Sequence, residues 1–199
     1  MRLKIFLAVL LIVISAPAFA QVAPSATGEG VSLPLSVGGG ATMMDLDWGH
    51  SRRMEGPTVW IDWNLTRVSK RFGGLGIELE GHAIDYGKPK SIPRMRQDSY
   101  GGGAIYTVQR YHNFRPYGKF LIGYGSLDFD NSNPDYKHDT RTIYMAGLGV
   151  EYHLAGNLWA RGDYEYQFWP KLFQNAQTLD PQGITIGATY KFGHRGLQY

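Results

Sequence analysis

The sequence contains no cysteine among its 199 residues. This absence excludes disulfides, thiolate metal sites and the acylated N-terminal cysteine by which a lipoprotein is anchored. Any attachment of this chain to a membrane therefore has to come from the fold.

Long apolar runs are also missing. The longest, Ile5 to Ile14, is about half of the roughly 20 residues that a membrane-spanning helix needs. A helical membrane anchor is therefore a less favoured interpretation of this run than an export signal. Arg2 and Lys4 precede this run, and the small-x-small sequence Ala18-Phe19-Ala20 follows it. The pattern predicts an export signal over residues 1–20, cleaved after Ala20, and a flexible periplasmic lead over residues 21–33.

An excess of positive charge is missing once the signal is removed. The formal net charge is +3, and without Arg2 and Lys4 the chain has 18 basic residues against 17 acidic ones. Nucleic acid is a poor partner for such a balanced surface.

What the sequence does contain is a series of segments, each of about ten residues, in which apolar and polar side chains alternate. In the last of them Ile184, Ile186 and Ala188 alternate with glycine, threonine and lysine. Turn-forming residues separate the segments. The pattern predicts an all-β fold with eight strands, at 34–44, 57–66, 74–85, 98–109, 117–127, 142–153, 157–169 and 182–192.

The spacing of these segments predicts an antiparallel arrangement in which long connections at one end alternate with short turns at the other. An even number of strands places both termini in the periplasm. Strands of about ten residues are long enough to cross a bilayer when tilted, but every backbone group in lipid needs a partner, so the strands must close into a barrel. Residues 34–192 are therefore predicted to form an eight-stranded antiparallel up-and-down transmembrane β-barrel, followed by a short extension, 193–199.

Alternation alone also fits a soluble eight-stranded barrel of the lipocalin type, whose apolar face lines the interior. Aromatic residues near the strand ends of the apolar face favour the membrane barrel, because such residues form girdles at the two membrane interfaces. These residues are Trp63, Tyr100, Tyr124, Tyr144, Tyr152, Phe168, Tyr190 and Phe192.

The last segment carries a known pattern. Thr185, Gly187, Tyr190 and Phe192 resemble the β-signal by which the barrel-assembly machinery engages outer-membrane proteins. The resemblance implies assembly by that machinery. Residues 193–199 are a departure, since many such proteins end at the aromatic residue.

More widely, residues 34–192 resemble the small outer-membrane barrels typified by the OmpA transmembrane domain, OmpX and the porin-like proteins with an outer membrane protein β-barrel domain. The stretches 115–125 (RPYGKFLIGYG) and 161–167 (RGDYEYQ) are especially similar. The resemblance implies a location in the Gram-negative outer membrane, among its lipids and lipopolysaccharide.

Ten ionisable residues fall on the polar faces of the predicted strands and are expected inside the barrel. Buried charges must pair or be neutralised, so we expect a salt-bridged polar core; the alternative is a narrow gate in which Arg161 or Lys119 exchanges carboxylate partners. The ten are Asp62, Glu78, Glu80, His82, Lys119, Glu151, Arg161, Asp163, Glu165 and Lys191.

Between the third and fourth segments the chain is locally basic, with Lys88, Lys90, Arg94 and Arg96. Cationic side chains bind phosphate groups through charge-assisted hydrogen bonds. We expect contact with lipopolysaccharide phosphates, with ordinary loop solubility as the alternative.

No catalytic residues, cofactor or metal ligands are predicted. The pair His50-Ser51 has poor geometry for a dyad, because adjacent side chains of an extended chain point to opposite sides. The acidic stretch around His138 contains Asp128, Asp130, Asp135 and Asp139; it lacks a nucleophile motif and most of a calcium loop. The predicted function is a non-enzymatic structural or surface-interaction role in the envelope, with a porin-like channel and a surface lipid hydrolase as alternatives.

Overall fold

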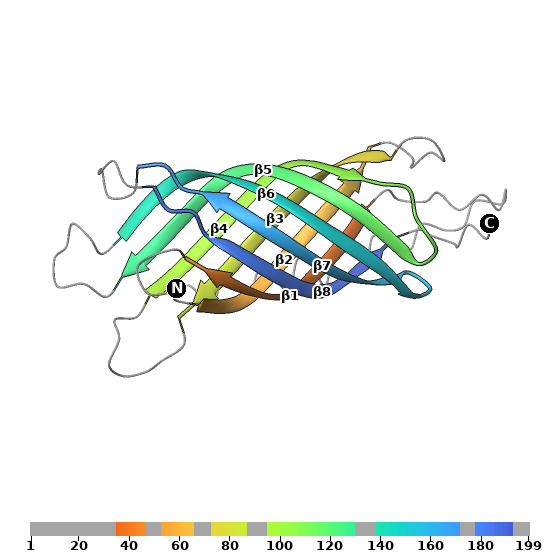
Figure 1. The fold of residues 1–199 in the computed structure, drawn as a ribbon, viewed down its shortest axis with the longest axis horizontal. Helices are drawn as coiled ribbons and strands as arrows, with labels where there is room; N and C mark the ends of the chain where they lie inside the picture. The colour runs from red at the N-terminus through yellow and green to blue at the C-terminus, as the bar shows by residue number, and fades with distance from the viewer. Residues whose placement is uncertain are drawn as a thin grey trace, which may run out of the picture. The chain divides into compact units, whose positions relative to one another are not determined.

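The computed structural model describes residues 35–46, 53–65, 73–86, 95–129, 138–171 and 178–192. In chain order the strands are β1 (Leu35–Asp45), β2 (Arg53–Asn64), β3 (Gly74–Asp85), β4 (Met95–Thr107), β5 (Phe114–Phe129), β6 (His138–Ala155), β7 (Leu158–Phe168) and β8 (Gln182–Lys191). Each pairs antiparallel with the next, and β8 pairs with β1, which closes the barrel (Figure 1). The predicted eight-stranded up-and-down barrel is confirmed.

Several strands extend beyond the segments expected from the sequence. β2 begins at Arg53 and β6 at His138, four residues before each predicted start. The antiparallel ladder pairs backbone groups, which polar residues supply as well as apolar ones, so pairing continues past the apolar part of each strand. The strict alternation of connection lengths is therefore wrong at the start of the chain, where residues 46–52 form a shorter connection than residues 65–73.

The barrel has two ends, which we name for what they hold. At the terminal end β1 begins, β8 ends, and a two-residue turn at 156–157 joins β6 to β7. The terminal end lies on the right of Figure 1. At the opposite end, the loop end, the chain runs from β1 to β2, from β3 to β4, from β5 to β6 and from β7 to β8. Among the described residues, no helix is long and apolar enough to cross a membrane.

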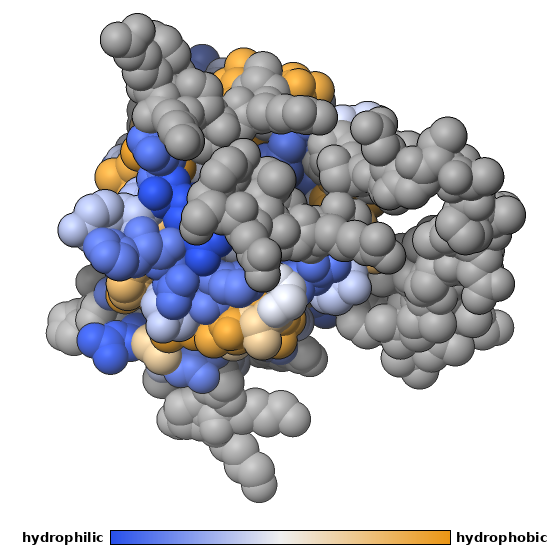
Figure 2. Space-filling model, turned by 90° about the vertical axis from the view of Figure 1, so that its right-hand side faces the viewer, coloured by the Kyte–Doolittle hydropathy of each residue, from blue (hydrophilic) through white to orange (hydrophobic). Residues whose placement is uncertain are grey.

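Side-chain parity divides the wall into an apolar outside and a largely polar inside. On β2, Val59, Ile61 and Trp63 are exposed, whereas Trp60 and Asp62 are buried. Figure 2 looks onto the terminal end, where hydrophilic residues gather toward the middle and hydrophobic residues lie at the margin. A soluble barrel of the lipocalin type would have the opposite arrangement.

Aromatic rings on the outer surface lie in pairs between neighbouring strands. The centroids of Tyr100 and Tyr124 are 6.1 Å apart, and those of Tyr144 and Phe168 are 6.4 Å apart. Nearer the terminal end, Phe114 and Tyr152 lie 4.9 Å apart. Rings at two levels of an apolar wall suit the two interfaces of a bilayer.

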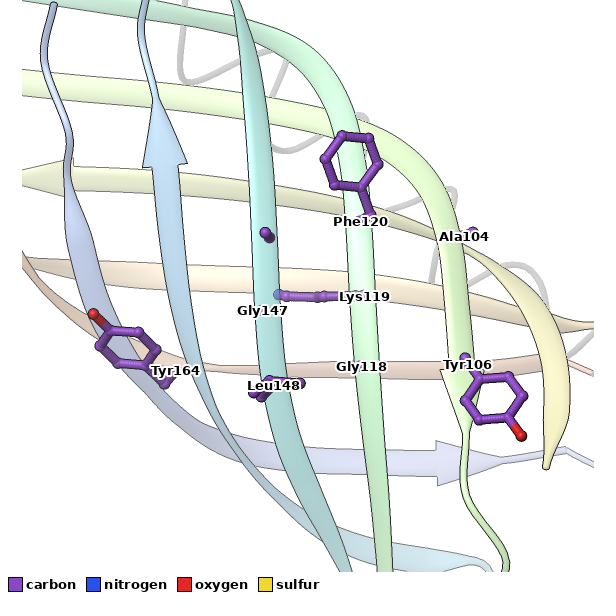
Figure 3. Close-up of a pocket in the computed structure, with 9 residues that line it drawn as sticks. Ala104, Tyr106, Gly118, Lys119, Phe120, Gly147, Leu148 and Tyr164 are labelled. Carbon is purple, nitrogen blue, oxygen red and sulfur yellow. The ribbon is translucent and has the colours of Figure 1, made fainter. Parts of the chain in front are cut away.

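A groove of about 500 Å³ crosses the outer surface from β4 to β7 (Figure 3). Small residues form its floor, Ala104, Gly118, Ala146 and Gly147, and larger side chains flank it. The flanking residues Tyr106, Phe120, Leu148 and Tyr164 are exposed. The groove therefore opens on the outer apolar wall, and Lys119, whose ammonium group lies in the lumen, also lines it.

Candidate functional site: the filled lumen and the outer rim

At the loop end an apolar cluster fills the lumen. We call it the apolar plug; its members are 2 % exposed or less, and nine of the eleven are 0 % exposed. Trp169, which follows β7, has its ring where a Cβ on Gly125 would lie, at 2.1 Å from the nearest ring atom, so a glycine on β5 is what leaves room for it. The plug comprises Met44, Leu46, Met54, Ile84, Met95, Leu121, Leu127, Ile143, Met145, Trp169 and Leu179.

Arg161 on β7 is the first centre of the charged network beyond the plug. Its Nη2 lies 2.9 Å from Glu78 Oε2, its Nε 3.1 Å from Asp163 Oδ2, and its Nη1 3.6 Å from Asp62 Oδ1. Tyr117 stacks against the guanidinium, with its ring centroid 4.6 Å away, and donates its hydroxyl proton to Asp163. Three carboxylates therefore surround a cation that is 2 % exposed.

Lys119 on β5 is the second centre. Its ammonium group pairs with Glu80, lies 2.7 Å from Glu165 Oε2, and has Glu78 and Asp163 oxygens at 3.6 and 3.8 Å. The side chains of all these groups are at most 1 % exposed. One lysine thus holds together carboxylates from β3 and β7, on opposite sides of its own strand.

His82 on β3 lies beside Glu80 and Glu165. Its Nε2 is 3.3 Å from Glu165 Oε1 and 3.6 Å from Glu80 Oε1. On its other side, Nδ1 is 2.8 Å from Thr58 Oγ1, and that hydroxyl is bonded in turn to Thr42. The imidazole is therefore held between a chain of hydroxyl groups and a pair of carboxylates.

The charged network is joined to the apolar plug by amide side chains. Gln167 donates its amide N–H to Glu165 Oε1 at 2.9 Å, and its carbonyl oxygen accepts from Gln97 and from the Trp169 indole, each at 2.9 Å. The amides thus satisfy polar groups at the boundary between the two layers.

The Trp60 side chain lies in the lumen, against β1 and β8. Its indole N–H donates to Thr189 on β8 at 2.9 Å, and the guanidinium of Arg161 lies 4.6 Å from its ring centroid. A Cβ on Gly38 would lie 2.3 Å from the ring. Trp60 thus lies on the otherwise polar inner face of β2, where it fills space that the glycine leaves free.

Near the terminal end, Lys191 on β8 pairs with Glu151 on β6 and lies 4.4 Å from the ring centroid of Trp159. The structure thus places all ten ionisable residues of the sequence analysis in the lumen, each 7 % exposed or less. Lys191 and Glu151 form their own pair, and the other eight form the central network.

On the outer rim at the loop end the structure brings together a hydroxyl, an imidazole and a carboxylate. His138 Nδ1 lies 2.6 Å from Asp128 Oδ1 on β5, and His138 Nε2 lies 3.1 Å from Thr140 Oγ1. Thr140 was missed by the sequence analysis; the signal for it is the His-x-Thr spacing, which puts both side chains on one face of a strand. His50, Ser51, Asp130 and Asp135 lie outside the described residues, and Asp139 pairs with Arg141.

Of the four basic residues expected to contact lipopolysaccharide, the structure describes Arg96 alone, and Lys88, Lys90 and Arg94 lie outside the described residues. Arg96 on β4 lies at the loop end and pairs with Asp98 at 2.9 Å, both side chains being more than a third exposed. An exposed pair of this kind contributes about 1 kcal/mol or less to stability.

The residues of the proposed assembly signal divide between the two faces of β8. Thr185 is buried and hydrogen-bonded to Thr42 at 2.7 Å, and Gly187 pairs with Gly40 of β1. Tyr190 and Phe192 form an edge-to-face ring pair at 5.1 Å, and the Phe192 backbone N–H donates to Leu35.

A closed barrel with an apolar outer wall, aromatic rings at two levels and a filled, charged interior defines the class of integral outer-membrane barrels. The sequence matches the model of the family described as outer membrane protein beta-barrel domain over residues 6–192, and the chain belongs to this family. The family indicates the Gram-negative outer membrane.

Solved structures share the fold. Neisserial surface protein A, NspA, is 17% identical, with a TM-score of 0.64 over 80% of this chain and 97% of that one. Ail of Yersinia pestis, in complex with the heparin analogue sucrose octasulfate, is 16% identical, with a TM-score of 0.56 over 79% and 97%. The outer membrane enzyme PagL is 9% identical, with a TM-score of 0.52 over 79% and 99%. Among curated proteins, none matches the sequence.

Proposed function

We propose that this protein is a closed, non-conducting outer-membrane barrel that acts at the cell surface through its loop end. The observation that carries the proposal is the filled lumen. The side chains of Lys119, Glu78, Glu80 and Asp163 have no solvent-accessible surface, and the apolar plug covers them on the loop side. An eight-stranded barrel is just wide enough for its own side chains to fill.

The surface role rests on the loop end, where the chain is basic between β3 and β4. A ligand that suits Lys88, Lys90, Arg94 and Arg96 is a dense array of phosphate groups, such as the headgroup region of lipopolysaccharide. Ail, a barrel of the same fold, was crystallised with a sulfated polyanion. That precedent supports binding of a polyanion by a small barrel of this fold.

Conductance in a planar bilayer tests the closed lumen. We expect no ion current from the wild-type protein and a measurable current from Trp169→Ala, because that change removes the largest ring of the apolar plug. The matched control is Trp63→Ala, which removes an exposed ring from the outer wall. A steady wild-type current that is reduced in Lys119→Met would instead support a porin-like channel gated by the charged network.

A second candidate function, a surface acyl-ester hydrolase, is favoured by the chain Asp128–His138–Thr140. The carboxylate faces Nδ1 and the hydroxyl faces Nε2, the order found in nucleophile–histidine–acid triads. All three lie on the rim, and the His138 side chain is 60% exposed. In this role His138 would take the Thr140 proton as the hydroxyl attacks an ester carbonyl, and would return a proton to the departing alcohol; water would then release the acyl group as a carboxylate.

Mass spectrometry of lipid A and phospholipids from expressing cells tests this candidate. Loss of an acyl chain that depends on Thr140, and that persists in the control Thr142→Val, would establish the hydrolase. Thr142 is the matched control because it lies two residues further along the same exposed face of β6. Identical lipid profiles with wild-type protein and Thr140→Val would exclude it.

A further inference from the structure

We propose that Glu80, His82 and Glu165 form a binding site for a divalent transition-metal ion, with Zn²⁺ as the best fit, inside the barrel. One ligand atom from each of these three residues lies within 4.8 Å of the other two. The residues come from β3 and β7 and are 4% exposed or less. The site is separate from the outer rim and from the loops of the proposed function.

The distances match the edges of a small coordination polyhedron. With Zn–N and Zn–O bonds of about 2.0–2.1 Å, two ligand atoms of a tetrahedral ion are about 3.3–3.4 Å apart. His82 Nε2 lies 3.3 Å from Glu165 Oε1 and 3.6 Å from Glu80 Oε1. Small side-chain adjustments would place all three atoms on one ion.

When His82 is neutral, two of these atoms lack a partner among the described side chains. Glu80 Oε1 and His82 Nε2 are fully buried, and neither has a hydrogen-bond partner among the described residues. Burying a polar atom without a partner is unfavourable. If His82 donates its Nδ1 proton to Thr58, its Nε2 lone pair points at carboxylate oxygens, and a cation between them removes the repulsion.

The charge of the surrounding network also calls for a divalent cation. Four carboxylates, those of Glu78, Glu80, Asp163 and Glu165, face two permanent cations, Lys119 and Arg161, whereas Asp62 also faces Arg115. Even a protonated His82 leaves these four carboxylates one negative charge in excess. Uncompensated charge in a buried, low-dielectric region is strongly unfavourable, and one divalent ion brings the cluster close to neutrality.

The types of the three ligand atoms determine which metal ions fit the site. An imidazole nitrogen with two carboxylate oxygens suits Zn²⁺ and related first-row ions, whereas Ca²⁺ and Mg²⁺ prefer oxygen ligands alone. Partners outside the three ligands hold them in place, as metal sites require. Thr58 binds His82 Nδ1, Lys119 holds both glutamates through their other oxygens, and Gln167 donates to Glu165.

Because the ligands are buried, the ion would enter while the strands close, so the test uses protein folded with and without metal. The chain is refolded into detergent micelles in the presence of Co²⁺, which absorbs visible light when bound in a tetrahedral site, and unbound metal is removed. We expect one Co²⁺ per chain, displaced when the protein is refolded with excess Zn²⁺. The matched variants are Glu165→Gln and Glu151→Gln, each of which removes one lumenal carboxylate; the first should lose the absorption and the second should keep it.

A milder variant, Thr58→Val, keeps the three ligands and removes the hydroxyl that orients His82. We expect its affinity for Zn²⁺ to fall by about 10–100-fold, the usual effect of losing an orienting partner. Equal Co²⁺ binding by wild type and Glu165→Gln, or none by either, would overturn the proposal.

If Glu165→Gln does not fold, the ¹⁵N chemical shifts of His82 in the wild-type protein decide. Zn²⁺ at the site must shift the Nε2 resonance while Nδ1 stays protonated. An imidazolium protonated on both nitrogens, with shifts that Zn²⁺ leaves unchanged, would show that a proton alone neutralises the site and would refute the metal.

Discussion

Replacing Arg161 with methionine removes a buried cation that pairs with three buried carboxylates. Glu78, Asp163 and Asp62 lie 2.9, 3.1 and 3.6 Å from its guanidinium nitrogens. Methionine fills much of the space of the arginine stem, so the change is chiefly one of charge. We expect the variant to fold into a barrel with a much lower free energy of unfolding.

The magnitude follows from the burial of the group. Breaking a buried pair by removing one partner costs about 3–5 kcal/mol, because the remaining charge is left uncompensated. Arg161 also lies 4.6 Å from the ring centroids of Trp60 and Tyr117, and desolvated cation–ring contacts contribute up to about 2 kcal/mol each. These terms overlap, so we expect a total loss of about 3–5 kcal/mol.

The assay is reversible unfolding by urea in detergent micelles or lipid vesicles, followed by tryptophan fluorescence and by gel mobility without heating. The matched control is Arg96→Met, which removes an arginine of the same size from a pair that is more than a third exposed. We expect that control to lose about 1 kcal/mol or less.

A loss below about 1 kcal/mol in Arg161→Met would refute the reasoning, since it would mean that water or protons compensate the carboxylates at little cost. The double variant Arg161→Met with Glu78→Gln checks the same point from the other side. Neutralising one of the three carboxylates should recover part of the lost stability.

Three further predictions concern other parts of the chain. Gly125→Ala should destabilise the barrel by about 1–3 kcal/mol in the same urea assay, because the new methyl group would lie 2.1 Å from the Trp169 ring. The comparison variant is Gly156→Ala, at a turn where nothing lies within 4 Å of the new Cβ but φ is +54°. It should lose about 1 kcal/mol of stability through backbone strain alone. Phe192→Ser should lower the amount of assembled barrel in cells, measured by unheated gel mobility of the outer-membrane fraction, while unassisted refolding into micelles stays unchanged; equal assembly of both proteins would contradict an assembly signal. Replacing Lys88, Lys90 and Arg94 with serine should reduce the lipopolysaccharide that co-purifies with the barrel, and unchanged co-purification would count against loop binding.

Side-chain parity made the wall of the barrel predictable. Strand residues alternate strictly between two faces, so the position of Glu78 or Arg161 on the polar face follows from its neighbours in sequence. The same rule predicted that the apolar face of the last strand, with Ile184 and Ile186, lies on one side. Both isoleucines are exposed on the outer wall.

Partners across the lumen could not be predicted in this way. Which carboxylates Lys119 contacts depends on the stagger of strands that are far apart in sequence, and a period-two pattern contains no information about stagger. The chain Asp128–His138–Thr140 was missed for a related reason. Its carboxylate comes from β5 and its other two members from β6, and the register between those strands is what makes them adjacent.

The apolar plug was missed because its residues, such as Ile84 and Met95, lie on the face that is polar elsewhere. In the sequence Ile84 is an apolar residue at a position where the alternation along the strand predicts a polar one. The sequence does not show that such residues on different strands lie close together. The structure shows that several of them lie at the same level of the barrel, where together they form a hydrophobic layer.

The hydrogen bond from the Trp60 indole to Thr189 joins β2 to β8 and passes across β1, which lies between them. It can form only after the first and last strands have paired, and this pairing is the event that closes the barrel. The emission of Trp60 should therefore respond to closure itself rather than to membrane insertion, and Trp63 on the outer wall of the same strand should respond to lipid. One strand thus carries separate fluorescent reporters for two steps of folding.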